Sequence, residues 1–360
     1  MSKTATAAVW NGPADGFRMA NVALPTLAAG EVLVETRAAT LCGSDLHTIA
    51  GERETPLPTV LGHEMVGDVV GVGGRVETHD GRPVEPGMRV TWTIGASCGK
   101  CRRCVRGLPQ KCVALRKYGH ATMTGEWALS GGLASHCHLV AGTGIVAVPD
   151  TMPDALSTPA NCATATVVCA VRKVGVTVGE TVVVTGCGML GLTAVAYLCS
   201  IGVRDVVACD VDAARRSLAE GAGASAAVAP DELAGAVREL TGGEGAEAVL
   251  DMSGSNAAIT SALDLLAIGG RLGLVGSVFP TSAIGIVPEA MVRGLLTVTG
   301  VHNYAPGDLV EAVRFLDEQA DRELFGGFVP DTFPLDRLDD AVAHAVAKRP
   351  PRVAVDPRQG

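Results

Sequence analysis

The pattern of hydrophobic and polar positions differs between two regions of the chain. Up to about residue 150, short β-branched runs are separated by Gly, Pro and Asp, and no helical period persists. The strands expected there are 31–36, 66–72, 88–93 and 144–148. This pattern predicts a domain of antiparallel β type.

From about Leu156, strand-like runs alternate with helical segments. The pattern predicts a strand at 181–185, an apolar helix, a strand at 206–209, a helix at 213–221, a strand at 248–251, a helix at 256–267 and a strand at 272–275. Such alternation predicts a parallel, doubly wound sheet. The interval between Glu180 and Arg204 is uncharged and long enough to suggest a membrane span, but its glycines and strand-like start argue against one.

After Gly300 the pattern predicts one helix at 307–319 and a final apolar strand at 352–355, which is too little for a further domain. We expect this tail to return to the first domain. The expected fold is therefore α/β, with a β-rich domain at 1–162, a doubly wound domain at 163–298 and a C-terminal return at 299–360.

Charge and cysteine content narrow the functional class. The 360-residue chain has a net charge of −9, and its 29 Lys and Arg form no stripe, which excludes a nucleic-acid footprint. The N-terminal residues MSKTATAAVW lack an apolar signal region, so we expect a cytoplasmic protein without a membrane partner. In a reducing compartment, its eleven cysteines are thiols or metal ligands in preference to disulfides.

A dinucleotide fingerprint follows the strand at 181–185. Gly186 allows the tight turn, Gly188 lets the backbone approach a pyrophosphate, and Gly191 lets the helix pack on the strand. Asp210 ends the next strand, where a carboxylate can hold the ribose hydroxyls of NAD and repel the 2′-phosphate of NADP. The expected cofactor-binding residues are Gly186, Gly188, Met189, Leu190, Gly191, Asp210, Arg215, Ser253, Val275 and Gly276. The bland alternative is a glycine-tolerant turn.

Two sets of side chains have the composition of metal sites. Cys98, Cys101, Cys104 and Cys112 lie on one glycine-containing loop, and four thiolates at this spacing can enclose a structural zinc. An iron–sulfur cluster is the competing interpretation. The second set comprises the segments CGSDLH at 42–47 and GHEMVG at 62–67, together with Cys162.

With these motifs in this order, the chain resembles zinc-dependent medium-chain alcohol dehydrogenases over nearly its whole length. The resemblance implies a GroES-like catalytic domain followed by a Rossmann domain. It implies Cys42, His63 and Cys162 as ligands of a catalytic zinc, which leaves a position for the substrate oxygen. It places Glu64 beside that zinc, with a buried ion-pair partner as the alternative role, and Asp45 behind the ligand imidazole.

The same resemblance assigns a proton relay and an activity. Ser44 and His47 match the relay that carries the alcohol proton to solvent, although a plain surface histidine is the alternative for His47. Arg352 matches a basic residue that meets the pyrophosphate, and a solvated surface charge is the alternative. The implied reaction passes a hydride from an alcohol to NAD, and family members are commonly homodimers or homotetramers. The rival classes are a zinc-free reductase and a non-catalytic NAD-binding protein.

Further stretches, among them KYGH, SGGLASHC and GVHNYAP, resemble a subgroup associated with phosphonate catabolism. A phosphonate alcohol would need donors near the zinc, and Lys117, His120 and His302 are the candidates. A neutral secondary alcohol or polyol is the alternative substrate. The remaining cysteines, at 137, 169, 187, 199 and 209, are expected to be core or loop thiols.

Overall fold

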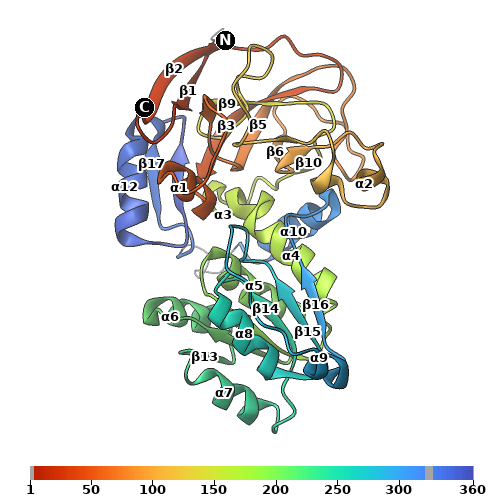
Figure 1. Ribbon diagram of the computed structural model, residues 1–360. Helices are drawn as coiled ribbons and strands as arrows, with labels where there is room; N and C mark the ends of the chain where they lie inside the picture. The colour runs from red at the N-terminus through yellow and green to blue at the C-terminus, as the bar shows by residue number, and fades with distance from the viewer. Residues whose placement is uncertain (1–3, 321–326, 360) are drawn as a thin grey trace. The chain divides into compact units, whose positions relative to one another are not determined.

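A computed structural model describes residues 4–320 and 327–359 (Figure 1). The chain forms two compact units. The first contains the residues up to Cys162 together with those from Tyr304 onward, and the second runs from Ala163 to Asn303. The assignment of these units as catalytic and NAD-binding domains stays a prediction.

The described residues of the first unit form many short strands together with several helices and 3-10 turns. Its elements are β1 (Thr4–Trp10), β2 (Phe17–Ala23), β3 (Val32–Thr40), α1 (Gly43–Ile49), β4 (Thr59–Val60), β5 (Glu64–Val72), β6 (Arg89–Trp92), β7 (Gly95–Ala96), α2 (Arg102–Val105), a 3-10 turn Pro109–Lys111, β8 (Arg116–Lys117), β9 (His136–Leu139), β10 (Ile145–Ala147), α3 (Asp154–Ser157), a 3-10 turn Thr158–Asn161, α10 (Pro306–Glu318), β17 (Asp331–Pro334), a 3-10 turn Leu335–Arg337, α12 (Leu338–Lys348) and β18 (Val353–Asp356).

One large sheet organises this unit. Its strand order is β10-β6-β5-β3-β18-β17, and β9 also pairs with β3. Smaller sheets have the orders β2-β1-β4 and β7-β8. The C-terminal strand β18 pairs antiparallel with β3, through Ala354 opposite Thr40, so this sheet joins the first and last parts of the unit. The strands expected up to about residue 150 pair antiparallel, as predicted, whereas β17 and β18 of the C-terminal return run parallel to each other.

The second unit alternates strands and helices. Its elements are α4 (Ala163–Val174), β11 (Thr181–Thr185), α5 (Met189–Ser200), β12 (Asp205–Cys209), α6 (Ala213–Gly221), β13 (Ala226–Val228), α7 (Leu233–Leu240), β14 (Ala246–Asp251), α8 (Asn256–Leu265), β15 (Leu266–Leu274), α9 (Pro288–Gly294) and β16 (Thr297–Gly300).

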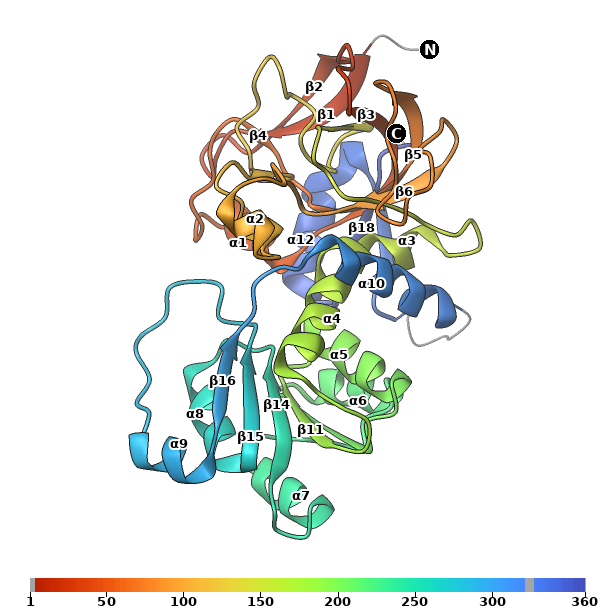
Figure 2. The same cartoon turned by 90° about the vertical axis from the view of Figure 1, so that its right-hand side faces the viewer.

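All neighbouring strands of this unit are parallel, in the order β13-β12-β11-β14-β15-β16, and Figure 2 shows β16, β15, β14 and β11 side by side. Val183 and Val249 pack with α7 and α8 in one apolar cluster. Helices α4 and α5 pack on each other and on the same strands. The doubly wound parallel sheet is confirmed.

The uncharged interval after Glu180 is divided between β11 and α5. Among the residues that the structure describes, no helix is long and apolar enough to span a membrane. The helix α4 has no counterpart in the sequence-based prediction. Nine of its twelve residues are buried, and its exposed charged residues, Arg172 and Lys173, come only in the last turn, so the polar side is short.

Candidate functional site: two thiol clusters and a nucleotide turn

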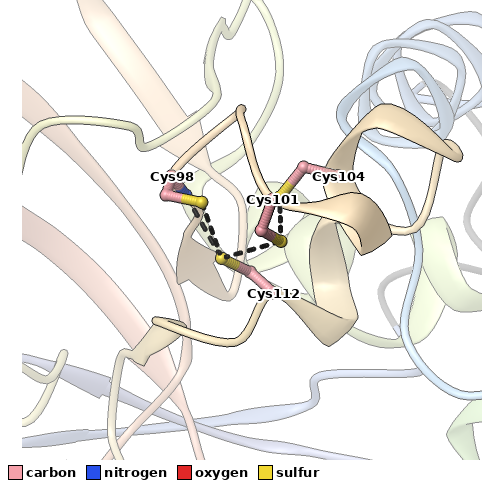
Figure 3. Close-up of side chains that lie close together, drawn as sticks. All are labelled: Cys98, Cys101, Cys104 and Cys112. Carbon is pink, nitrogen blue, oxygen red and sulfur yellow. Dashed lines mark hydrogen bonds between the residues drawn. The ribbon is translucent and has the colours of Figure 1, made fainter.

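The four cysteines of the loop 98–112 meet around one point (Figure 3). Sulfur–sulfur distances are 3.4 Å for Cys98–Cys112, 3.5 Å for Cys101–Cys104 and 3.9 Å for Cys101–Cys112. Thiolates at the corners of a zinc tetrahedron, with Zn–S of about 2.3 Å, are about 3.8 Å apart. The cluster therefore fits one tetrahedral ion, whereas the cysteines of a four-iron cluster each bind a different iron.

The backbone of this loop prepares the thiols for a cation. The N–H groups of Cys98 and Ala114 donate to the Cys112 sulfur over 3.3 Å and 3.4 Å, and these bonds lower the pKa of Cys112. The N–H of Val113 lowers the pKa of Cys101 to about 6. Metal ligands must be deprotonated, so these donors favour the charge that a zinc ion requires.

Cys104→Ser is expected to destabilise the chain more than it slows catalysis. An incomplete ligand shell releases an ion whose binding is coupled to local folding, and such a loss costs at least about 3 kcal/mol, or roughly 6–12 °C in melting temperature. Zinc analysis and thermal denaturation check this. Cys199→Ser, which changes a thiol outside both clusters, is the control and should retain both zinc ions. A Cys104→Ser protein with two zincs and an unchanged melting temperature would contradict a structural zinc.

The second cluster gathers residues from three segments. Cys42 precedes α1, His63 and Glu64 lie at the start of β5, and Cys162 follows the 3-10 turn at 158–161. Their ligand atoms all lie within 4.8 Å of one another. A hydrogen bond from Cys162 and the charge of Arg352 hold the pKa of Cys42 well below its usual range, despite burial. Two sulfurs and an imidazole with this spacing suit zinc and leave one position open.

Asp45 ties the two ligand-bearing segments together. Its Oδ2 accepts the backbone N–H of Cys42 at 3.0 Å, and its Oδ1 lies 3.4 Å from both the N–H of Gly62 and Nδ1 of His63. Burial lowers the pKa of His63, but the charges of Asp45 and Cys42 outweigh it and raise that pKa to about 10. With this pKa, both ring nitrogens of His63 carry a proton at neutral pH. A metal ion that binds Nε2 must displace the proton there, and the N–H that remains at Nδ1 faces Asp45.

Glu64 forms an ion pair with an arginine that is distant in the sequence. Arg352 donates from Nε to Oε2 at 2.6 Å and from Nη2 to Oε1 at 2.8 Å, and Thr40 donates to Oε2 at 2.7 Å. The same Nη2 lies 3.4 Å from the Cys42 sulfur. Strand order β5-β3-β18 brings these residues together. The pyrophosphate contact of Arg352 stays a prediction.

The two predicted relay residues lie on α1. Ser44 and His47 are three positions apart and therefore share a helix face. Ser44 Oγ lies 3.4 Å from Nε2 of His63. His47 is half exposed, and its Nδ1 pairs with Glu52 at 2.5 Å, a contact missing from the prediction. The serine thus borders the metal cluster, and the histidine has access to water.

The glycines of the nucleotide turn have the space that their predicted roles require. Gly186 has a φ of +87°, which side chains other than glycine rarely adopt. A Cβ on Gly191 would lie 1.8 Å from the Gly186 carbonyl oxygen, so only glycine permits this helix to start so close to the strand. A Cβ on Gly188 would meet nothing within 4 Å. The turn thus leaves room beside Gly188, where α5 begins with Met189 and Leu190.

The other predicted cofactor residues follow the carboxyl ends of neighbouring strands. Thr185 pairs in register with Cys209 and Asp251, and Asp251 with Leu274, so these ends share one sheet edge. Asp210, Ser253, Val275 and Gly276 come directly after them, and Arg215 lies in α6. Ligands bind at this edge of open parallel sheets.

Two backbone N–H groups hold the carboxylate of Asp210 in place. Its Oδ2 accepts the N–H of Cys187 at 2.7 Å, and its Oδ1 accepts that of Asp212 at 2.8 Å. Asp251 fixes the next turn in the same way, by accepting from Ser253 and Gly254. The carboxylate of Asp210 is therefore oriented before any ligand arrives.

The three predicted anion donors are divided between the two units. Lys117 and His120 belong to the first unit, next to the second metal cluster, and His302 belongs to the second unit. The rings of His120 and His63 are 4.9 Å apart between centroids.

Comparisons with known proteins agree with this combination of a metal centre and a nucleotide turn. Residues 28–150 match the alcohol dehydrogenase GroES-like domain, and residues 190–318 match the zinc-binding dehydrogenase family. An L-threonine 3-dehydrogenase of Chelativorans sp. (strain BNC1) is 32% identical over 273 residues, which cover 73% of this chain and 74% of that relative. One of Deinococcus radiodurans is 31% identical over 300 residues, covering 81% and 80%.

Solved structures give the same result. An alcohol dehydrogenase from Thermotoga maritima superposes with a TM-score of 0.93 at 27% identity, covering 99% of this chain and all of that one. Alcohol dehydrogenase TADH from Thermus sp. ATN1 has a TM-score of 0.84 at 25% identity, covering 98% and 99%. The fold and the site define a metal-dependent dehydrogenase.

The chain belongs to the zinc-dependent medium-chain dehydrogenase family. It is an oxidoreductase that acts on the CH–OH group of small hydroxy compounds, with zinc and NAD as cofactors. The predicted family, fold class and reaction are confirmed. The subgroup linked to phosphonates stays a prediction.

Proposed function

We propose that the chain is an NAD-dependent zinc alcohol dehydrogenase whose catalytic zinc is held by Cys42, His63 and Cys162. The observation that carries the proposal is the convergence of these ligand atoms, with Glu64, within 4.8 Å. Asp45 behind His63 and the oriented turn at Gly186 support it. A second zinc at Cys98, Cys101, Cys104 and Cys112 stabilises the first unit. The first unit is the catalytic domain, and the second binds NAD.

When bound, zinc polarises the substrate hydroxyl and NAD accepts the hydride. Cys42 and Cys162 cancel the formal charge of the ion, which keeps the product from binding too tightly. Ser44, whose Oγ borders the metal cluster, would take up the hydroxyl proton, and His47, half exposed on the same helix face, would release a proton to water at the other end of the relay. Asp45 holds His63 in the tautomer that leaves Nε2 for the metal.

Zinc content and NADH formation across a panel of alcohols test this function. A dehydrogenase with both sites contains two zincs per chain and reduces NAD with at least one alcohol. A zinc-free reductase would contain neither ion, and a non-catalytic protein would bind NAD without reducing it. Either of these outcomes would reject the proposal.

NAD is expected to be preferred over NADP by about a hundredfold or more in kcat/KM, because Asp210 repels a 2′-phosphate in a partly desolvated site. Arg216 already donates to the carbonyl oxygens of Asp210 and Val211, so it is engaged elsewhere than with a 2′-phosphate. Asp210→Asn removes the repelling charge and should reduce the preference for NAD over NADP in kcat/KM at least tenfold. Asp205→Asn removes the same charge at the other end of β12 and should leave the ratio unchanged. Equal efficiency of both cofactors in the unaltered chain would contradict this role.

A homo-oligomer formed through the second unit is also part of the proposal. Strand β16 ends its sheet. Side chains nearby are apolar and strongly exposed: Ile268 at 81%, Val292 at 72% and Leu295 at 68%. A second copy would cover both features and give a dimer, or a tetramer through a further contact. We place the protein in the cytoplasm, where its thiols stay reduced. Sedimentation of the zinc-loaded chain gives the oligomeric state.

A further inference from the structure

Beside the second metal cluster lies a group of hydrogen-bond donors that the proposed reaction leaves unused. Both ring nitrogens of His120 are buried and have no partner among the described residues. A buried polar atom without a partner costs about 1–3 kcal/mol, so such an atom needs an explanation. The ring of His120 lies against that of the ligand His63. The unsatisfied imidazole therefore points to a molecule that binds next to the metal.

The segment that carries His120 is fixed against the metal cluster. Gly119 has a φ of +71°, and a Cβ there would lie 2.8 Å from the Gly62 carbonyl oxygen and 3.1 Å from Cβ of His63. The N–H of Gly119 donates to Ser130 at 2.8 Å, and the N–H of Tyr118 donates to Ile94 at 3.0 Å. The donors on this segment are thus preorganised, which lowers the entropic cost of binding.

Two cations accompany the imidazole. Lys117 is half-buried in β8, and Arg53 is half-buried in the loop after α1. Burial, together with the positive charge of Arg53, lowers the pKa of Lys117. Neither cation forms a salt bridge with any described residue. The sulfurs of Cys162 and Cys42 oppose this lowering of the Lys117 pKa, and a bound zinc cancels the charge that both carry as metal ligands.

We propose that Arg53, Lys117 and His120 form a pocket for the anionic group of the substrate, which is a hydroxy acid carrying a carboxylate or a phosphonate close to its hydroxyl. This inference rests on the proposed function, because it names the substrate class of the same site. Lys117 and Arg53 supply charge, and His120 donates one N–H to the oxyanion. A neutral alcohol leaves these groups unpaired, so the pocket discriminates against it.

Matched substrates test the pocket in the zinc-loaded, full-length chain with NAD. One pair is 3-hydroxybutyrate and 1,3-butanediol, and the other is 2-hydroxyethylphosphonate and 3,3-dimethyl-1-butanol. We expect at least one acid to exceed its neutral match about tenfold or more in kcat/KM, and the two arms distinguish carboxylate from phosphonate. Lys117→Met should lower kcat/KM for that acid by about ten- to a hundredfold, mainly through KM, with little change for the neutral alcohols.

His120→Phe keeps a ring against His63 and should also lower kcat/KM for the acid. The control is Lys348→Met, which alters an exposed lysine of α12 and should leave kcat/KM unchanged for both substrate classes. Calorimetric binding of butyrate and ethylphosphonate gives a readout that does not require turnover. Neutral alcohols oxidised as well as the acids, or Lys117→Met affecting both classes equally, would overturn the pocket and leave the dehydrogenase intact. Anion binding that Lys117→Met removes, without NAD reduction by any alcohol, would keep the pocket and reject the proposed function.

Discussion

Cys42→Ser is expected to reduce alcohol oxidation below detection. The change removes one of two thiolates from a buried cluster in which the charge of Arg352 and the hydrogen bond from Cys162 favour the Cys42 thiolate. A hydroxyl is a far weaker zinc ligand than a thiolate, so the ion at this site is lost or displaced, and with it the group that polarises the alcohol. Steady-state kinetics and zinc analysis measure the effect, and the expected zinc content falls from two to one per chain.

His47→Gln separates loss of the metal from loss of the relay. His47 is half exposed, is bound to Glu52 and does not belong to the cluster of ligand atoms. This variant should keep both zincs and slow oxidation by only about ten- to a hundredfold, because water can take over the proton transfer. Should Cys42→Ser stay active with two zincs, the catalytic-zinc assignment would be wrong. Full activity of His47→Gln at neutral pH would contradict the proton relay but leave the catalytic-zinc assignment intact.

The sequence is most informative where function depends on local spacing. Cys98, Cys101, Cys104 and Cys112 occupy one loop, so fifteen residues contain the whole ligand set. The segment from Thr181 to Asp210 likewise contains its strand, turn, helix and acid in one run, and the structure has β11, α5 and β12 there. In both places the interacting groups are neighbours along the chain, so periodicity and motif spacing are sufficient to predict them.

The sequence is least informative where function depends on which strands are neighbours. Glu64 and Arg352 are 288 positions apart and meet because β18 inserts beside β3. An apolar run such as 353–356 indicates a strand but not its partner, because both directions of pairing suit the same side chains. Strand β17, which pairs parallel with β18, has no counterpart in the sequence-based prediction.

His120 illustrates a second limit. The motif KYGH identifies a candidate donor, but only the structure brings its ring to 4.9 Å from His63 and leaves both nitrogens buried. The approach depends on Gly119 and Gly62, whose backbones lie close together although they are 57 positions apart in the sequence. Arg53 lies in a loop without a motif, so no local signal indicated it. The charge environment of the site is thus a property of the fold.

Arg352→Met is expected to destabilise the zinc-loaded chain by about 3–5 kcal/mol, because it leaves the buried carboxylate of Glu64 without its counterion. Burial and the charge of Cys42 already raise the pKa of Glu64, whereas Arg352 and His63 lower it. For a unit of this size, the loss corresponds to a melting temperature lower by roughly 6–20 °C.

The double variant Arg352→Met with Glu64→Gln determines whether the unpaired charge is the cause. The Glu64→Gln change replaces the carboxylate by a neutral amide, which could still accept the hydroxyl hydrogen of Thr40 that now bonds to Glu64 at 2.7 Å. Removing both partners of a buried pair is far less costly than removing one. The double variant should therefore recover most of the stability in denaturant unfolding at fixed zinc concentration. If it is as unstable as Arg352→Met alone, the arginine contributes through packing of β18 on β3, and the pairing of its charge with Glu64 has little part in holding the metal cluster together.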